Sequence, residues 1–237
     1  MPRATSQPSA AGESAASPSR RRLLAGAGLA TTAGLTVGLP GTAEAGGRRR
    51  IAVGPEGTTV VEFRGRISQT GSTGQAFTSL GYLIRAAGAR ASDMFAAGTP
   101  SQATALFTAY ATGDLSARVL DQAVHSLDII GQMIVYQRTA PGADWTIPAS
   151  FTDGTAVARF DLRLQDVLTV FAPGQGLPNI TGDMLQTTAG ALSGGLIGAV
   201  FGQPGQQLRM FAAGLGTLIN PATFTADFEI AGNWSAQ

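Results

Sequence analysis

The sequence predicts an all-β fold, namely a single closed antiparallel β-barrel of about eight strands. Two observations predict it. Short segments in which apolar and polar residues alternate recur along the chain, and turns rich in glycine and proline separate them. The chain also has no strand–helix–strand unit and no internal repeat. A barrel is favoured over a β-sandwich because the 32 glycines supply bends at which strands can curl and close.

A hairpin is predicted at the start of the domain. Residues 59–67 alternate, with Val61 and Phe63 on one face. The opposite face is charged and carries Glu62, Arg64 and Arg66. A polar, glycine-rich turn at 69–75 leads to a second extended segment, 76–85, whose apolar residues are in phase at Leu80, Tyr82 and Ile84.

The middle of the chain predicts two further strands after a loop. Residues 87–100 are small and broken by glycine and proline, which indicates a loop with one helical turn around Met94 and Phe95. Residues 103–111 alternate again. Residues 124–137 are apolar on both faces, as in a strand that is covered on both sides. A helix over 115–135 is the alternative, weakened by β-branched residues and by Gly131.

The second half contains the clearest strand. After a loop at 141–154, Ala158, Phe160, Leu162 and Leu164 alternate with Arg159, Asp161, Arg163 and Gln165. Residues 172–183 are rich in glycine and proline and predict a long loop. Short strands are expected at the following ranges, with a tight turn at 202–206 between the second and the third: 184–191, 196–201, 208–213 and 223–230.

The N-terminal segment has the three regions of an export signal. Residues 19–24, SRRRLL, fit the twin-arginine pattern, an apolar run follows, and Ala43-Glu44-Ala45 is a small-x-small cleavage site. We therefore expect a twin-arginine signal peptide at 1–45, a flexible linker at 46–57 and the barrel domain at 58–237. The twin-arginine translocase is then a partner, and the product is soluble and extracellular or in the cell envelope. The alternative is a disordered basic tail before an ordinary helix.

Composition excludes several function classes. Without lysine the chain has no Schiff base and no P-loop, and without cysteine it has no thiol nucleophile and no disulfide. Its one histidine, His125, excludes the usual histidine-rich metal sites, so no metal and no cofactor are expected. Charges nearly cancel after residue 45, which argues against nucleic acid as a partner.

Part of the sequence resembles a known family. The stretch from 158 to 195, ARFDLRLQDVLTVFAPGQGLPNITGDMLQTTAGALSGG, and LRMFAAG at 208–214 resemble the allene oxide cyclase-like barrel superfamily. Its bacterial members include cyclases that form rings of polyketides by [4+2] cycloaddition. The resemblance runs loosely over 58–234 and implies a closed barrel with an apolar lumen, no cofactor, and catalysis by holding a flexible substrate in its reactive shape. A homodimer is expected from the resemblance alone.

The resemblance also implies site residues. Some of these cyclases pair a glutamate on the first strand with an arginine on a late strand, and the positions here are Glu62 and Arg209. Glu62 shares a face with two arginines, however, and such a face is more often solvated. The cysteine of the plant enzymes has no counterpart, so allene oxide cyclase activity itself is not expected.

Other candidates come from the residues themselves. Tyr82 is the third catalytic candidate, as a hydroxyl that binds a carbonyl, with packing as its alternative. The substrate-binding candidates are Tyr110, Tyr136, Trp145, Phe107, Phe160, Gln165, Gln186 and Phe211. Trp145 is expected either as a lid or packed on the barrel wall, and the two glutamines either bind ligand or satisfy backbone groups. His125 is interpreted as structural, and Asp166 as the polar end of a strand.

Two functions from different classes follow. The first is a cofactor-free cyclase that rearranges a hydrophobic, polyketide-type natural product inside the barrel. The second is a lipocalin-like barrel that binds or carries such a molecule without changing it. A surface interaction barrel and a hydrolase are the weaker alternatives. The first two predict the same fold and differ in whether the ligand leaves altered.

Overall fold

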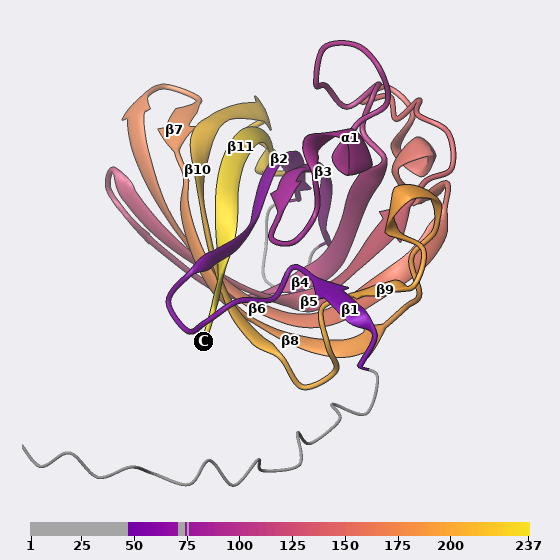
Figure 1. Cartoon of the computed structure of the whole chain (residues 1–237). Helices are drawn as coiled ribbons and strands as arrows, with labels where there is room; N and C mark the ends of the chain where they lie inside the picture. The colour runs from indigo at the N-terminus through magenta and orange to yellow at the C-terminus, as the bar shows by residue number, and fades with distance from the viewer. Residues whose placement is uncertain (1–46, 71–73, 75) are drawn as a thin grey trace, which may run out of the picture. The chain divides into compact units, whose positions relative to one another are not determined.

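Eight strands form one antiparallel sheet that is hydrogen-bonded in a ring (Figure 1). The computed structural model describes residues 47–70, 74 and 76–237, so the expected signal peptide lies outside the described residues. Each strand of the ring pairs with the next along the chain, and the last pairs with the first. The eight are β2 (Thr59–Gln69), β3 (Ala76–Ala86), β4 (Phe107–Asp121), β5 (Val124–Gln137), β6 (Thr155–Ala172), β8 (Asn179–Ala189), β10 (Gln207–Asn220) and β11 (Thr225–Ala236).

The ring is not a regular barrel. A short strand, β7 (Gln175–Leu177), inserts between β6 and β10 at one end of the ring. Register shifts interrupt several pairings, including the β4–β5 pair between Leu115 and Ala117. Such bulges bend a strand and increase its twist. The predicted antiparallel all-β class is thus confirmed, whereas the ring that closes it is irregular.

The inside of the ring is a solid aromatic core. Trp234 lies against two rings, with its centroid 5.9 Å from that of Phe63 and 5.6 Å from that of Phe160. All three side chains are buried. The cavity beside Phe63 and Trp234 has a volume of only about 40 Å³. The middle of the ring therefore has no room for a substrate.

Facing glycines allow the sheet to curve tightly around this core. Gly113 on β4 lies opposite Gly131 on β5, and both are on the inner face. A Cβ atom on Gly131 would lie 2.2 Å from the carbonyl oxygen of Thr112 and 2.8 Å from the Cα atom of Gly113. No side chain fits at that approach. At this pair the glycines allow the strands to curl, as expected from the sequence.

A small second sheet covers one end of the ring, the plugged end. Strand β1 (Arg49–Ile51) pairs in parallel with β9 (Ala199–Phe201), and Ile51 and Phe201 are buried. The ring of Phe201 lies 6.1 Å from that of Phe107 on β4. Helix α1 (Ala91–Met94) and the 3-10 turn η2 (Gly194–Leu196) lie at the same end. The range expected as a linker, 46–57, thus contains a strand that packs on the ring.

A loop layer covers part of the outer wall. The 3-10 turn η1 (Pro148–Thr152) lies over β3 and β4, where the Thr108 hydroxyl donates a hydrogen bond to the carbonyl oxygen of Phe151 over 2.7 Å. Leu80, Ala143 and Phe151 form a second, smaller core there. In the described part of the chain, no helix is long and apolar enough to cross a membrane.

Strand alternation was predicted well where large apolar side chains mark one face. The strands expected at 59–67, 76–85, 124–137 and 158–165 are present, and the inward faces of β2 and β6 are as predicted. The single helical turn near Met94 and the tight turn at 202–206 are also confirmed. The alternative helix over 115–135 is wrong, because that range lies in β4 and β5.

Several boundaries and faces were predicted wrongly. Residues 172–183 are not a long loop: Gly174 adopts a φ of 70°, so the chain turns back at once to form β7 and then β8. The short strands expected at 208–213 and 223–230 extend further, as β10 and β11, and only Ala199–Phe201 of 196–201 is a strand. Residues 103–106 precede β4.

Two predicted faces also differ. Strand β5 is not covered on both sides, because the outer side chain of Ile130 is 56% exposed. Leu80, Tyr82 and Ile84 do share a face, but it is the outer one: Leu80 and Tyr82 lie opposite Arg66 and Arg64, and Ile84 is 39% exposed. Apolar composition alone did not reveal either feature.

Candidate ligand-binding site

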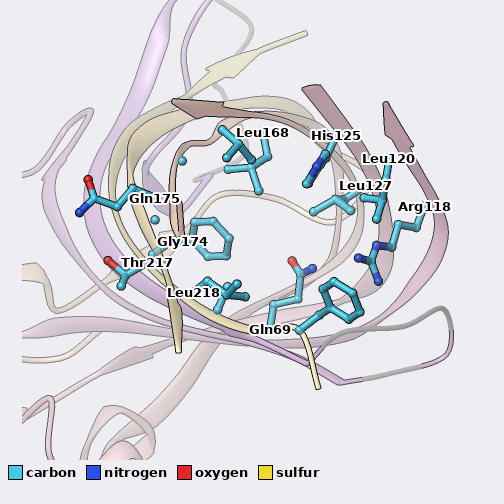
Figure 2. A pocket seen from close by; sticks show the side chains of 16 residues that line it. Gln69, Arg118, Leu120, His125, Leu127, Leu168, Gly174, Gln175, Thr217 and Leu218 are labelled. Carbon is cyan, nitrogen blue, oxygen red and sulfur yellow. The ribbon is translucent and has the colours of Figure 1, made fainter. Parts of the chain in front are cut away.

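A cavity opens at the end of the ring opposite the plugged end. We call this the hairpin end, because β4 turns into β5 there, β6 into β7, and β10 into β11. The cavity has a volume of about 170 Å³ (Figure 2). Most of its lining is apolar, with Leu127, Leu168, Leu218 and Phe228 as its larger members. A concave, largely apolar site with a few polar groups is typical of small-molecule binding.

Glycines keep one wall of the cavity thin. Gly176 on β7 and Gly216 on β10 both line it and pair with each other. A Cβ atom on Gly176 would lie 2.7 Å from the Cδ1 atom of Leu168, and one on Gly216 would lie 2.4 Å from the Cδ1 atom of Phe228. Leucine and phenylalanine therefore pack directly on the backbone. The hairpin end remains open where the middle of the ring is filled.

Three polar side chains from different strands line the cavity. They are Gln69 at the end of β2, Arg118 on β4 and His125 on β5. In Figure 2, Arg118 and His125 lie on the side of the cavity that also carries Leu120 and Leu127, and Gln69 lies between Arg118 and Leu218. Gln69 is only 7% exposed. The guanidinium carbon of Arg118 lies 4.3 Å from the centroid of the Phe224 ring, a cation–π contact that holds it at the rim.

A buried acid lies next to the cavity. Asp166 on β6 is 3% exposed and faces inward between Leu127 and Ile180. One carboxylate oxygen accepts a hydrogen bond from the backbone N–H of Asn179 over 3.0 Å. Burial raises the pKa of Asp166 to about 7, and this hydrogen bond opposes the rise. A carboxyl with such a pKa can gain or lose a proton near neutral pH.

The predicted catalytic residues lie elsewhere. Glu62 forms an ion pair with Arg85 over 2.8 Å, and Arg209 forms one with Asp183 over 2.7 Å. Both pairs are on the outer, solvent-exposed face of the ring, so the internal pair that the resemblance implied is not formed. Tyr82 also faces outward, since it lies opposite Arg64. The exterior position that the alternation of β2 indicated for Glu62 is confirmed.

Trp145 packs on the barrel wall and is not a lid. Its ring lies 6.2 Å from that of Tyr82 and 4.7 Å from that of Phe151, and the guanidinium of Arg66 lies 4.9 Å from its centroid. Phe95 covers the other edge of Tyr82 at 6.2 Å. The outer wall therefore carries an aromatic group that is separate from the hairpin-end cavity.

The other substrate-binding candidates are distributed over core and surface. Phe107 and Phe160 are buried in the core, and Gln165 and Phe211 are exposed on the outer face. Tyr110 and Tyr136 are half-buried on the outer face. Gln186 satisfies backbone groups: its amide donates to the carbonyl oxygens of Thr188 and Phe201, each over 2.8 Å, and accepts from the N–H of Gln203. None of the eleven candidates lines the hairpin-end cavity.

The residues that do line it were missed for identifiable reasons. Arg118 lies in the part of β4 to which no strand was assigned, and Gln69 lies where a turn was expected to begin. His125 was interpreted as structural. The signal available in the sequence was the position of all three next to turns, which ring closure brings together.

Metal binding and known relatives give no further assignment. Among the residues that the structure describes, no cluster of three or more His, Asp or Glu side chains could hold a metal ion. Comparisons of the chain with family models, curated proteins and solved structures gave no significant match.

Proposed function

We propose that the protein binds a small, largely apolar molecule in the hairpin-end cavity. The observation that carries this proposal is an open, mostly apolar cavity of about 170 Å³ at the end of a ring whose middle is filled. An apolar cavity of about 150 Å³ suffices for benzene. One aromatic ring or a short branched chain thus fits inside, and the remainder of a larger ligand extends through the mouth.

The finer fold assignment is part of the proposal. An allene oxide cyclase-like or calycin-like barrel is supported by the sequential order of the eight strands around the ring. The residues that carry the resemblance, 158–195, fall on β6, β7, β8 and the turn η2. Small barrels either fill with side chains or hold one small ligand. We infer that this ring does the first in its middle and the second at its hairpin end.

Cyclisation of a hydrophobic, polyketide-type molecule is the second candidate function. The specific observation in its favour is Asp166, a buried acid with a raised pKa next to the cavity. It would supply a proton-transfer group in place of the exterior Glu62 and Arg209. A cyclase would return a product of unchanged mass and altered structure, whereas a binding protein returns the ligand unaltered.

Filling the cavity is expected to abolish binding. Ala226 on β11 lines the cavity, so an Ala226→Phe substitution places a ring in the space that a ligand would occupy. Hydrocinnamamide, a neutral molecule with one aromatic ring, serves as the probe in isothermal titration calorimetry. Because burial of an aromatic ring contributes about 1.5–3 kcal/mol, we expect binding at least about tenfold weaker in the variant.

The control variant adds an aromatic side chain on the outer face of the sheet, away from the cavity. Ala231 lies on the same strand and is exposed on the outer face, so Ala231→Phe should leave the affinity for hydrocinnamamide unchanged. Equal affinity in Ala226→Phe and in the unmodified protein would exclude this cavity as the site.

We also propose export by the twin-arginine pathway. The support is the order of the basic, apolar and cleavage regions in residues 19–45. The expected result is a secreted protein whose intact mass corresponds to a chain that begins at Gly46. Replacing Arg20 and Arg21 by lysine should keep the full-length chain inside the cell. Secretion of that variant at the normal level would contradict the assignment.

A further inference from the structure

We propose that Gln69 makes the hairpin-end cavity selective for ligands that carry a primary amide or a lactam beside their apolar part. The carboxamide of Gln69 pairs with the amide of the ligand through hydrogen bonds to both of its polar atoms. This inference rests on the proposed function and adds the chemical class of the ligand and the residue that selects it. It derives from the burial of Gln69, from its hydrogen bonding and from its direction in the cavity.

Gln69 is the deepest polar residue of the cavity. It follows Ile67 on the inward face of β2 and is 7% exposed. Within the described part of the chain, it is the only polar residue of the lining that is buried. The other polar side chains of the lining are half-buried or exposed, namely Arg118, His125, Gln175 and Thr217. A polar side chain at the depth of Gln69 is usually hydrogen-bonded.

The carboxamide of Gln69 has no hydrogen-bond partner among the described residues. The residues beside it on the neighbouring strands are Phe77 on β3 and Ala226 on β11, whose side chains neither donate nor accept hydrogen bonds. A buried amide without a partner costs free energy, and a ligand that satisfies it recovers that cost on binding. The group is thus available to a ligand.

The amide is directed into the cavity. Figure 2 shows the end of the Gln69 side chain pointing inward, with its oxygen and its nitrogen both at the tip, and Leu168 on the opposite side. A ligand that enters the cavity thus meets a hydrogen-bonding group on one side and an apolar side chain on the other. Such an arrangement orients a ligand as well as binding it.

The chemistry of a carboxamide defines the matching group. The side chain presents an acceptor and a donor next to each other, so its best partner presents a donor and an acceptor in the same way. A primary amide or a lactam does so, because its C=O and one N–H point to the same side. A ketone or an ester has no donor and leaves the Gln69 oxygen unpaired. Sites built to hydrogen-bond a ligand discriminate strongly against analogues that leave a buried polar group unpaired.

A matched pair of probes tests the proposal. Benzylacetone differs from hydrocinnamamide in having a methyl group in place of the NH₂ group, so it keeps the carbonyl acceptor and loses the donor. The affinities of both are measured by isothermal titration calorimetry for the unmodified protein, for Gln69→Met and for Gln165→Met. Methionine is unbranched like glutamine and carries no amide. Gln165 is exposed on the outer face of β6, so its replacement removes an amide away from the cavity.

The expected result is a preference for the amide that depends on Gln69. The unmodified protein and Gln165→Met should bind hydrocinnamamide about tenfold more tightly than benzylacetone. In Gln69→Met the preference should reverse, because the amide then loses its hydrogen bonds to water without replacement. Benzylacetone should still bind this variant, which shows that its cavity is intact. The urea midpoint of Gln69→Met should not fall, because the substitution removes a buried amide that has no partner.

Four outcomes would overturn the inference. If benzylacetone binds the unmodified protein as tightly as the amide does, the cavity binds apolar molecules without amide selection and the proposed function stands alone. If the preference survives in Gln69→Met, another group selects the amide. If the urea midpoint of Gln69→Met falls clearly, the carboxamide already has a partner in the folded protein. If neither probe binds the unmodified protein, the proposed function fails together with the inference.

Discussion

Replacing Asp166 by asparagine is expected to stabilise the protein by several kcal/mol above neutral pH and by little in acid. Asparagine keeps the shape of the side chain and an oxygen that can accept the hydrogen bond from the N–H of Asn179. It removes the charge that burial disfavours. The pKa of the carboxyl is 3.8 in the absence of perturbation and about 7 in the folded protein. This difference corresponds to about 4 kcal/mol as an upper limit.

The pH window follows from the direction of the shift. Because the pKa of Asp166 is higher in the folded than in the unfolded state, the unfolded chain loses this proton first as pH rises. The free energy of unfolding of the unmodified protein should therefore fall between about pH 4 and about pH 7, and then level off. Urea unfolding of both proteins over this range measures the difference.

A matched control separates this effect from a general effect of charge. Asp161 lies on the same strand, is exposed on the outer face, and is 3.3 Å from the amide nitrogen of Gln132. Asp161→Asn should change stability by less than about 1 kcal/mol at every pH. Parallel stability curves for Asp166→Asn and the unmodified protein would show that Asp166 is not held in a costly environment. A costly buried acid beside a cavity is typical of a functional group.

The second large effect is expected at the centre of the core. Trp234→Ala removes the ring that lies between Phe63 and Phe160 and should lower the free energy of unfolding by about 3–5 kcal/mol. The indole nitrogen finds no hydrogen-bond acceptor among the described residues. Trp234→Phe therefore loses ring volume without losing a hydrogen bond, and it should cost clearly less than the alanine variant.

Urea unfolding followed by far-ultraviolet circular dichroism measures both substitutions. If Trp234→Ala does not fold, the phenylalanine variant still tests the account, because it retains most of the aromatic packing and should unfold cooperatively. A loss below about 1 kcal/mol in Trp234→Ala would mean that the middle of the ring is not a solid core.

The sequence predicted strands where a large apolar residue marks every second position. This holds for β2 and for the start of β6, and in both the inward face was correct. It failed for the second half of β10, where two successive inward positions, Gly214 and Gly216, carry no apolar side chain. It also failed at 172–183, because the pairing of β7 depends on a turn at Gly174.

The candidate site could not be predicted either, because local alternation does not show which strands meet in space. Gln69, Arg118 and His125 come from β2, β4 and β5, and they line one cavity only because the strands close into a ring in one register. Local alternation cannot supply that register. It did give one correct warning: Glu62 shares a face with Arg64 and Arg66, which placed it outside the ring. The position implied by the resemblance placed it inside, and the structure agrees with the alternation.

A ligand is expected to enter the hairpin end of the ring and no other part of it. The most direct test is a nuclear magnetic resonance titration of isotopically labelled protein with hydrocinnamamide. Shifts are expected for the backbone amides of Leu127, Leu168 and Gly216 and for the side-chain amide of Gln69, with the core around Trp234 unchanged. Shifts confined to the outer wall around Tyr82 and Trp145, or none at all, would contradict it.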